Sequence, residues 1–191
     1  MKILGIDLAG SEKRNSGYCI LGEDGARFGI LRSDEEVISL VGKEKPAIVA
    51  MDAPLSLPEG RRRIEEKNEK HFRECDVMLR DMGIKFFPIT IGPMRMLTKR
   101  GIELKKKIRK GNKKIKIIEV FPGATYDVYG VGRKNKEEIA GWAKKFGVDV
   151  RNAKTQDELD AVACAITGKL YSQGKAILLD GKDGAIAIPK A

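Results

Sequence analysis

Acidic residues stand at the ends of three apolar segments that are typical of buried strands. Asp7 follows "ILGI", Asp52 ends "PAIVAMD", and Glu119 lies near the end of "IKIIEVF". An ionised carboxylate in an apolar setting costs free energy unless a cation or a hydrogen-bond donor meets it. Hard oxygen donors that converge in one place favour Mg²⁺ or Mn²⁺ as that partner.

The elements that carry these acids decide whether they meet. If the three segments are parallel neighbouring strands, about 4.8 Å apart, their acids lie together at the carboxyl edge of the sheet, where ligands of open α/β sheets bind. The later segment "TQDELDAVACAITG" predicts a helix with Asp157 and Asp160 on one face among small residues. We expect this helix to approach the sheet closely and to bring both acids towards those of the strands.

Each acid also has an ordinary structural interpretation. Asp7 precedes Ala-Gly-Ser and could start a turn, Asp52 precedes Ala-Pro-Leu and could cap one, and Glu119 could pair with a lysine. Asp157 and Asp160 could simply stabilise the N-terminus of their helix through its dipole. Independent turn signals have no reason to coincide at strand ends, so the pattern favours a shared metal site.

The remaining pattern predicts one α/β domain over residues 1–191. Apolar segments at 2–8, 17–22 and 26–31 predict an antiparallel meander, because Asp24-Gly25 between the last two is a hairpin turn signal. A helix from Asp34 to about Gly42 then makes a parallel return by the strand at 46–52 natural. Further elements are expected as helices near 71–82, 93–110, 135–146 and 155–171, a strand at 115–121, and a C-terminal hairpin around "LLDGKDGAIAI".

Residues 53–114 are polar and basic, and we expect them to form a helical insertion that faces the substrate. The net charge of the chain is +10, and residues 95–116, with eleven Lys and Arg and one Glu, carry all of this excess. Such a patch favours a polyanionic partner, because Lys and Arg that neutralise phosphates release counterions. A solvated helix face in a Lys- and Glu-rich, heat-adapted protein would have the same composition.

Candidate phosphate contacts come from two places in this insertion. Three follow the Asp52 loop, where an ordinary solvated loop is the alternative, and six lie in the basic segment. They are Arg61, Arg62, Arg63, Arg95, Lys99, Arg100, Lys105, Lys106 and Lys107.

Composition limits the class of protein. No stretch approaches the roughly 20 apolar residues that span a bilayer, and the N-terminus reaches the charged Asp7 too soon for a secretory signal. Three scattered cysteines and one histidine, His71, fit neither a disulfide framework nor a zinc site. We expect a cytoplasmic protein with no membrane partner, and the oligomeric state is left open.

Five motifs, in order along nearly the whole chain, resemble a known family. They are "GIDLAGS", "MDAPLSLP", "RECDVMLRDMG", "IIEVFPGATYD" and "DELDAVACAITG". This set is similar to a domain-of-unknown-function family of predicted nucleases with a ribonuclease H-like fold. The resemblance implies an α/β fold with a five-stranded mixed sheet, order 3-2-1-4-5, flanked by helices, and a carboxylate site for two metal ions.

The resemblance also implies roles for the acids. Asp7, Asp52 and Asp160 match the family's acids in the first strand, the fourth strand and the last helix. Glu119 belongs to the family's own motif, and Asp157 resembles an additional acid of Holliday-junction resolvases. The implied catalytic set is Asp7, Asp52, Glu119 and Asp160, and the implied metal set is Asp7, Asp52, Asp157 and Asp160, with Mg²⁺ or Mn²⁺ as cofactor.

The predicted function is metal-dependent hydrolysis of phosphodiester bonds in a nucleic acid, DNA or RNA. One alternative is a nucleic-acid-binding protein without catalysis. Another is a metal-dependent hydrolase or phosphotransferase of small phosphorylated substrates. "GIDLAGS" also resembles the phosphate loop of the sugar kinase, actin and chaperone ATPase superfamily, but those proteins bind nucleotide between two such domains and this chain has room for one.

Overall fold

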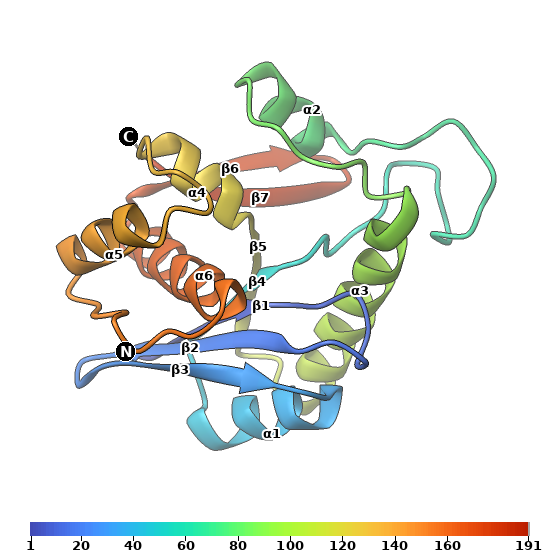
Figure 1. The fold of residues 1–191 in the computed structure, drawn as a ribbon. Helices are drawn as coiled ribbons and strands as arrows, with labels where there is room; N and C mark the ends of the chain where they lie inside the picture. Colours follow the sequence, from blue (N-terminus) through green and yellow to red (C-terminus); the bar gives the residue numbers. More distant parts are fainter. Residues whose placement is uncertain (191) are drawn as a thin grey trace.

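Seven strands form one mixed sheet in the computed structural model, which describes residues 1–190 (Figure 1). Their order across the sheet is β3-β2-β1-β4-β5-β7-β6. The strands are β1 (Ile3–Asp7), β2 (Ser16–Gly22), β3 (Gly25–Leu31), β4 (Ile48–Asp52), β5 (Lys116–Val120), β6 (Ala176–Gly181) and β7 (Gly184–Pro189). The predicted order of the first five strands is confirmed, and the sheet is two strands wider than expected.

The additional strands come from the C-terminal hairpin. β7 pairs with β5 in parallel and β6 pairs with β7 in antiparallel orientation. An exposed β5 would leave unpaired backbone groups at the sheet edge. The apolar β7 pairs with β5 at Ile186 and Ala187, both of which are buried. The hairpin is therefore part of the sheet and does not stand apart from it.

The register of the central strands decides which way each acid points. β1 and β4 are parallel, and Asp7 lies directly opposite Asp52. β4 and β5 are also parallel, but Glu119 lies opposite Met51, one residue before Asp52. Since successive side chains of a strand point to opposite faces, Asp7 and Asp52 share one face and Glu119 belongs to the other. Glu119 thus lies on the other face from Asp7 and Asp52, although it is near enough to raise the pKa of Asp52.

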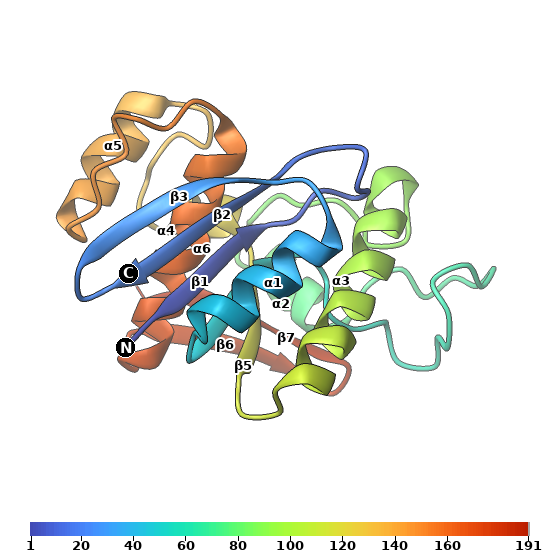
Figure 2. The same ribbon diagram turned by 90° about the horizontal axis from the view of Figure 1, so that it is seen from below.

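Helices cover both faces of the sheet (Figures 1 and 2). The face of Asp7 and Asp52 carries α6 (Gln156–Ser172), with α4 (Pro122–Val128) and α5 (Lys136–Lys145) beside it. The opposite face carries α1 (Asp34–Glu44) and α3 (Gly92–Gly111), whose apolar residues pack on Leu4, Ile6 and Val49. No helix within residues 1–190 has both the length and the apolar character that a membrane crossing requires.

The insertion is helical in two pieces, close to the helices predicted near 71–82 and 93–110. Its helices are α2 (Glu74–Asp81) and α3, and residues 53–73 contain neither helix nor strand. α2 packs its buried Cys75 and Leu79 against the C-terminal hairpin. The predicted start of this helix at 71 is three residues early, because Arg73 has extended backbone and acts as the N-cap.

Two other helices have informative first turns. α1 begins at Asp34, as predicted, and is capped by Ser33, whose hydroxyl accepts from the Glu36 amide. α4 was not predicted, because "FPG" reads as a turn. Pro122 instead occupies the first turn of α4, where its missing N–H is tolerated.

Candidate active site

α6 lies unusually close to the strands that carry Asp7 and Asp52, because glycines face it. A Cβ added at Gly5 of β1 would lie 2.2 Å from the carbonyl oxygen of Ala161, and one at Gly17 of β2 would lie 1.9 Å from that of Asp157. Only glycine permits such an approach. The predicted close contact of this helix with the sheet is confirmed.

The proximity of the acids is evident in their electrostatics. Burial raises the pKa of Asp7 well above its ordinary value, and the neighbouring Asp52, then Asp160 and Asp157, raise it further, while Arg14 lowers it. Burial also raises the pKa of Asp52, followed by repulsion from Asp160 and Glu119. No cation or hydrogen-bond donor within residues 1–190 offsets these effects on Asp52. The two strand-end carboxylates therefore form a crowded site that is short of positive charge.

Asp160 is held in place by two donors from the protein. The Tyr126 hydroxyl donates to its Oδ1 at 2.9 Å, and Gln156 Nε2 donates to the same oxygen at 2.8 Å. Burial raises the pKa of Asp160 to about 6, although both hydrogen bonds lower it. Sequence reasoning missed Tyr126 and Gln156. The sequence did hint at both residues. Tyr126 lies in the motif "IIEVFPGATYD", and Gln156 is one helical turn before Asp160.

The ligand atoms that Asp7, Asp52 and Asp160 offer are all carboxylate oxygens, which hard divalent cations prefer. Little positive charge from the protein lies near them. In the described part of the chain, however, no three His, Cys, Asp or Glu side chains are grouped so that they could hold a metal ion as they stand. The carboxylates are thus neighbours without forming a closed ligand sphere.

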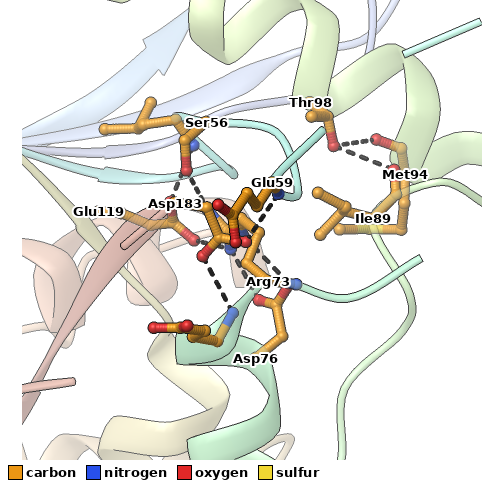
Figure 3. Close-up of polar contacts among 11 residues, drawn as sticks. Ser56, Glu59, Arg73, Asp76, Ile89, Met94, Thr98, Glu119 and Asp183 are labelled. Carbon is orange, nitrogen blue, oxygen red and sulfur yellow. Dashed lines mark hydrogen bonds and ion pairs between the residues drawn. The ribbon is translucent and has the colours of Figure 1, made fainter. Parts of the chain in front are cut away.

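Glu119 has a different partner. Arg73, with 1% of its surface exposed, donates from Nη1 to Glu119 Oε2 at 2.7 Å and from Nη2 to Oε1 at 2.6 Å (Figure 3). Arg73 also pairs with Asp76 at 2.8 Å, and the Leu55 amide donates to Glu119 Oε2 at 2.8 Å. Both oxygens of Glu119 are therefore committed within the protein, which favours a positioning role over a catalytic one.

The ion-paired cluster anchors the loop that follows Asp52. Arg73 Nη1 donates to the Ser56 hydroxyl at 3.1 Å, beside the Leu55 amide that Glu119 holds. At the tip of the hairpin, Asp183 accepts from the Glu59 amide at 2.9 Å and from the Glu74 amide at 3.0 Å. Arg73 is the first residue of the motif "RECDVMLRDMG", but its role was not predicted, because nothing local links it to Glu119.

Two adjoining cavities open beside the carboxylates. One, of about 530 Å³, is lined by Asp52 together with Arg73, Glu119 and a set of aromatic and aliphatic residues. The other, of about 230 Å³, is lined by Asp7, Arg14 and Asp157. Met94 and Leu97 of α3 line both. Asp7, Asp52 and Asp157 therefore face these two cavities, whereas Asp160 is not among their lining residues.

Several of the predicted phosphate contacts are committed to the protein itself. Arg61 is buried and donates to the carbonyls of Ile64, Glu66, Asn68 and Lys70, so it organises its own loop. Arg100 is buried against Asp34 at 2.9 Å and against the Ala9 carbonyl at 2.7 Å. Burial and these internal hydrogen bonds favour a structural role for both arginines, and their predicted phosphate contacts stay predictions.

The other predicted basic residues divide into three whose side chains have a partner within the protein and four whose side chains have none within residues 1–190. Lys99 pairs with Glu65 at 3.0 Å, Lys107 pairs with Asp34 at 3.1 Å, and Lys105 donates to the Leu55 carbonyl at 3.2 Å. Arg62, Arg63, Arg95 and Lys106 are exposed. Lys106 also lines a surface hollow of about 510 Å³ with Arg109, Lys110 and Lys113. Exposed basic side chains therefore gather at the C-terminal end of α3.

The crowded site has a consequence for pH. With chelator present, the protein should lose stability as the pH rises from about 4 to about 6. In that window folded Asp160, with a pKa raised from 3.8 to about 6, still binds a proton that the unfolded chain has released. The difference corresponds to about 3 kcal/mol, lost progressively across the window. Asp160→Asn, whose amide oxygen can still accept from Tyr126, should flatten this dependence.

Urea unfolding of both proteins between pH 4 and pH 7 measures the effect. The unfolding free energies should diverge in favour of the variant as the pH rises. Parallel pH profiles would contradict the assignment of a raised pKa to Asp160.

Two solved structures resemble the chain over almost its whole length. "T. thermophilus RuvC in complex with Holliday junction substrate" matches with a TM-score of 0.55 and 14% identity, over 97% of this chain and 99% of that chain. "Thermus thermophilus RuvC structure" matches with a TM-score of 0.51 and 13% identity, over the same shares. The chain therefore has the nuclease-like, ribonuclease H-like fold of RuvC, which confirms the predicted fold class.

The family of the chain follows from its sequence. None of the curated proteins compared with the chain matches it. Residues 5–183 match the family described as "Protein of unknown function (DUF429)". This match covers all but the ends of the chain and includes Asp7, Asp52 and Asp160, so the chain belongs to the DUF429 family.

Proposed function

We propose that this protein is a metal-dependent nuclease that hydrolyses phosphodiester bonds at the cluster of Asp7, Asp52 and Asp160. The observation that supports the proposal is that burial and neighbouring carboxylates raise the pKa values of these three acids, with little positive charge to offset them. Crowded, desolvated acids in a cleft are typical of functional sites. A bound cation would supply the missing charge.

The residues of the chain have distinct roles in this proposal. Asp7, Asp52 and Asp160 would hold Mg²⁺ or Mn²⁺, with Asp157 beside them, and the bound metal would activate water and stabilise the leaving oxygen. Tyr126 and Gln156 fix the orientation of Asp160 through its Oδ1. These two donors leave the second oxygen of Asp160 available to a cation.

Glu119 acts at a distance from the reacting groups in this scheme. Together with Arg73 it holds the Leu55 amide and so shapes the loop that follows Asp52. We therefore replace the predicted catalytic role of Glu119 by a positioning role.

A nucleic acid is the partner that the chemistry favours. The similar RuvC structure contains a Holliday junction, and the exposed basic residues on α3 suit a phosphate backbone. The three cysteines are free and buried, which supports a reducing compartment such as the cytoplasm.

A cleavage screen tests the proposal. The full chain is incubated with single-stranded and duplex DNA, RNA, an RNA–DNA hybrid and a four-way junction, each with Mg²⁺, with Mn²⁺ and with chelator. Cleavage with metal and none with chelator is the expected result. Tight binding without cleavage would favour a non-catalytic binder, and turnover of mononucleotides alone would favour a small-substrate hydrolase. Either outcome overturns the nuclease proposal.

The basic surface of α3 gives a second measurement. Lys106→Gln with Lys110→Gln should weaken nucleic-acid binding at all sequences and reduce the slope of log affinity against log salt by about 0.7 per lost contact on a single strand. Lys144→Gln with Lys145→Gln, on α5 at the other face of the sheet, removes the same charge and should leave the slope unchanged. Equal slopes in both double variants would mean that α3 does not contact the phosphates.

A further inference from the structure

The larger of the two cavities is built differently from the carboxylate cluster beside it. Its wall is formed by aromatic and aliphatic side chains from the segment before α3, from α3 itself and from the end of β5. They include Phe86, Phe87, Ile89, Met94, Leu97 and Phe121. Its volume, about 530 Å³, falls in the range of sites for small organic ligands. A cavity for a phosphate alone would be smaller and polar, so this one suits a flat, largely apolar group.

Charged groups frame the cavity in a specific arrangement. Asp52 lines it and so connects it to the carboxylate cluster. Lys85 and Arg133 also line it. Arg133 lies over the Phe121 ring at 5.2 Å, while Lys85 is exposed and forms no ion pair within residues 1–190. The cavity thus offers an apolar wall next to a cation, with the proposed reaction centre at one side.

Hydrogen bonds hold this wall in position. The buried Thr98 hydroxyl lies 2.7 Å from the Met94 carbonyl and 3.1 Å from the Ile89 carbonyl, which ties the segment before α3 to the helix (Figure 3). Across the cavity, Arg73 is fixed by Glu119 and Asp76. Because both sides are anchored, the cavity is preformed and needs little ordering when a ligand enters.

Phe87 is the most exposed large apolar side chain of the chain's described residues, with 77% of its surface accessible. The neighbouring Phe86 is fixed edge-to-face against Phe72, with ring centroids 6.1 Å apart. An exposed aromatic ring beside an apolar cavity offers a stacking surface that every nucleobase can use.

We infer that this cavity binds one unpaired nucleobase of the strand whose phosphodiester lies at the carboxylate cluster. The inference rests on the proposed function and adds a substrate class to it. A base within a continuous duplex is stacked and paired, so it can enter only if it is unstacked first, and single-stranded or locally unpaired strands avoid that cost. The protein therefore prefers single-stranded or locally unpaired nucleic acid over a continuous duplex.

Binding without metal tests the inference independently of cleavage. In chelator, fluorescence anisotropy is measured with a labelled oligothymidine strand and with an abasic strand of equal length and charge. The wild type should bind the oligothymidine on the order of tenfold more tightly, and Phe87→Ala should lose most of this difference. The variant should still bind the abasic strand like wild type.

The matched control is Ile91→Ala. Ile91 is also apolar and exposed, but it does not line the cavity. This variant should keep the wild-type preference for bases. Both side chains are largely in solvent, so melting temperatures should stay at the wild-type value and show that the fold is intact.

Several results would overturn the inference. One is that the wild type binds the two strands with equal affinity. Another is that Phe87→Ala weakens binding to both strands by the same factor. A third is displacement of the strand by free thymidine monophosphate at the strand's own affinity, which would make the cavity a site for free nucleotides.

The two proposals can fail separately. Metal-dependent cleavage of abasic and normal strands at the same rate would refute the base site and leave the nuclease proposal standing. Base-dependent binding with no cleavage under any metal would refute the nuclease proposal and leave the base site standing.

Discussion

Asp52→Asn should abolish metal-dependent cleavage, by a factor of at least about a thousand, while the metal-free variant is as stable as the wild type or more stable. Asparagine keeps the shape of the side chain and removes its charge. A metal ion contributes several kcal/mol of transition-state stabilisation, and each factor of ten in rate corresponds to about 1.4 kcal/mol. In the empty site, burial and the repulsion from Asp160 that raise the pKa of Asp52 also destabilise its charged form.

Thermal melting with chelator, with Mg²⁺ and with Mn²⁺ measures the stability part of this prediction. Added metal should stabilise the wild type more than the variant, because stabilisation by a ligand grows with the logarithm of its concentration relative to its dissociation constant for the folded state. Asp24→Asn is a suitable control, since Asp24 is exposed in the turn between β2 and β3 and both Asp-Gly and Asn-Gly favour that turn. It should behave like wild type in every measurement.

The opposite pattern would identify Asp52 as a turn-capping residue. In that case Asp52→Asn would melt lower in chelator, and metal would shift both proteins equally. The proposed cluster would then lack its central ligand.

Arg73→Met should destabilise the protein by about 3–5 kcal/mol. The substitution leaves Glu119 and Asp76 as buried carboxylates without their cation, and breaking a buried ion pair from one side costs about this much. Urea unfolding at neutral pH measures the loss. Arg151→Met removes a similar contact, to Asp149, from a fully exposed position and should cause no resolvable change.

Removing the stranded charges should restore most of the loss. In the triple variant Arg73→Met, Glu119→Gln, Asp76→Asn, no uncompensated charge stays buried, and the glutamine oxygen can still accept from the Leu55 amide. If the single variant were as stable as Arg151→Met, the cluster in Figure 3 would have no role in holding the loop after Asp52.

The sequence was sufficient to predict those parts of the fold and of the site that depend on a local pattern. Asp7 and Asp52 each lie at the end of an apolar strand, in the same position of its alternating side-chain pattern. The small residues beside Asp157 and Asp160 predicted the close approach of α6. Glu119 shows where this fails. Its strand was found, but the face to which it points depends on a register against β4 that shifts it by one residue, and such a shift reverses every side chain.

Partners distant in the sequence were the other source of error. The arginine that pairs with Glu119 lies 46 residues earlier, and Asp34 engages both Arg100 and Lys107 from 66 and 73 residues away. Composition shows that residues 95–116 are basic, but it does not show which cations are already used. The C-terminal hairpin was recognised from its own turn, whereas its place beside β5 follows from packing that no local pattern reports.

The long-range closure of the sheet by its last elements has a consequence for biosynthesis. Asp183 of the final hairpin bonds the Glu59 amide across 124 residues, and Cys164 of α6 reaches the Ile6 carbonyl across 158. At synthesis rates of about 5–20 residues per second, the strands with Asp7 and Asp52 leave the ribosome several seconds or more before the helix that completes their cluster. Asp7, Asp52 and Asp160 therefore cannot come together in a nascent chain until α6 has left the ribosome.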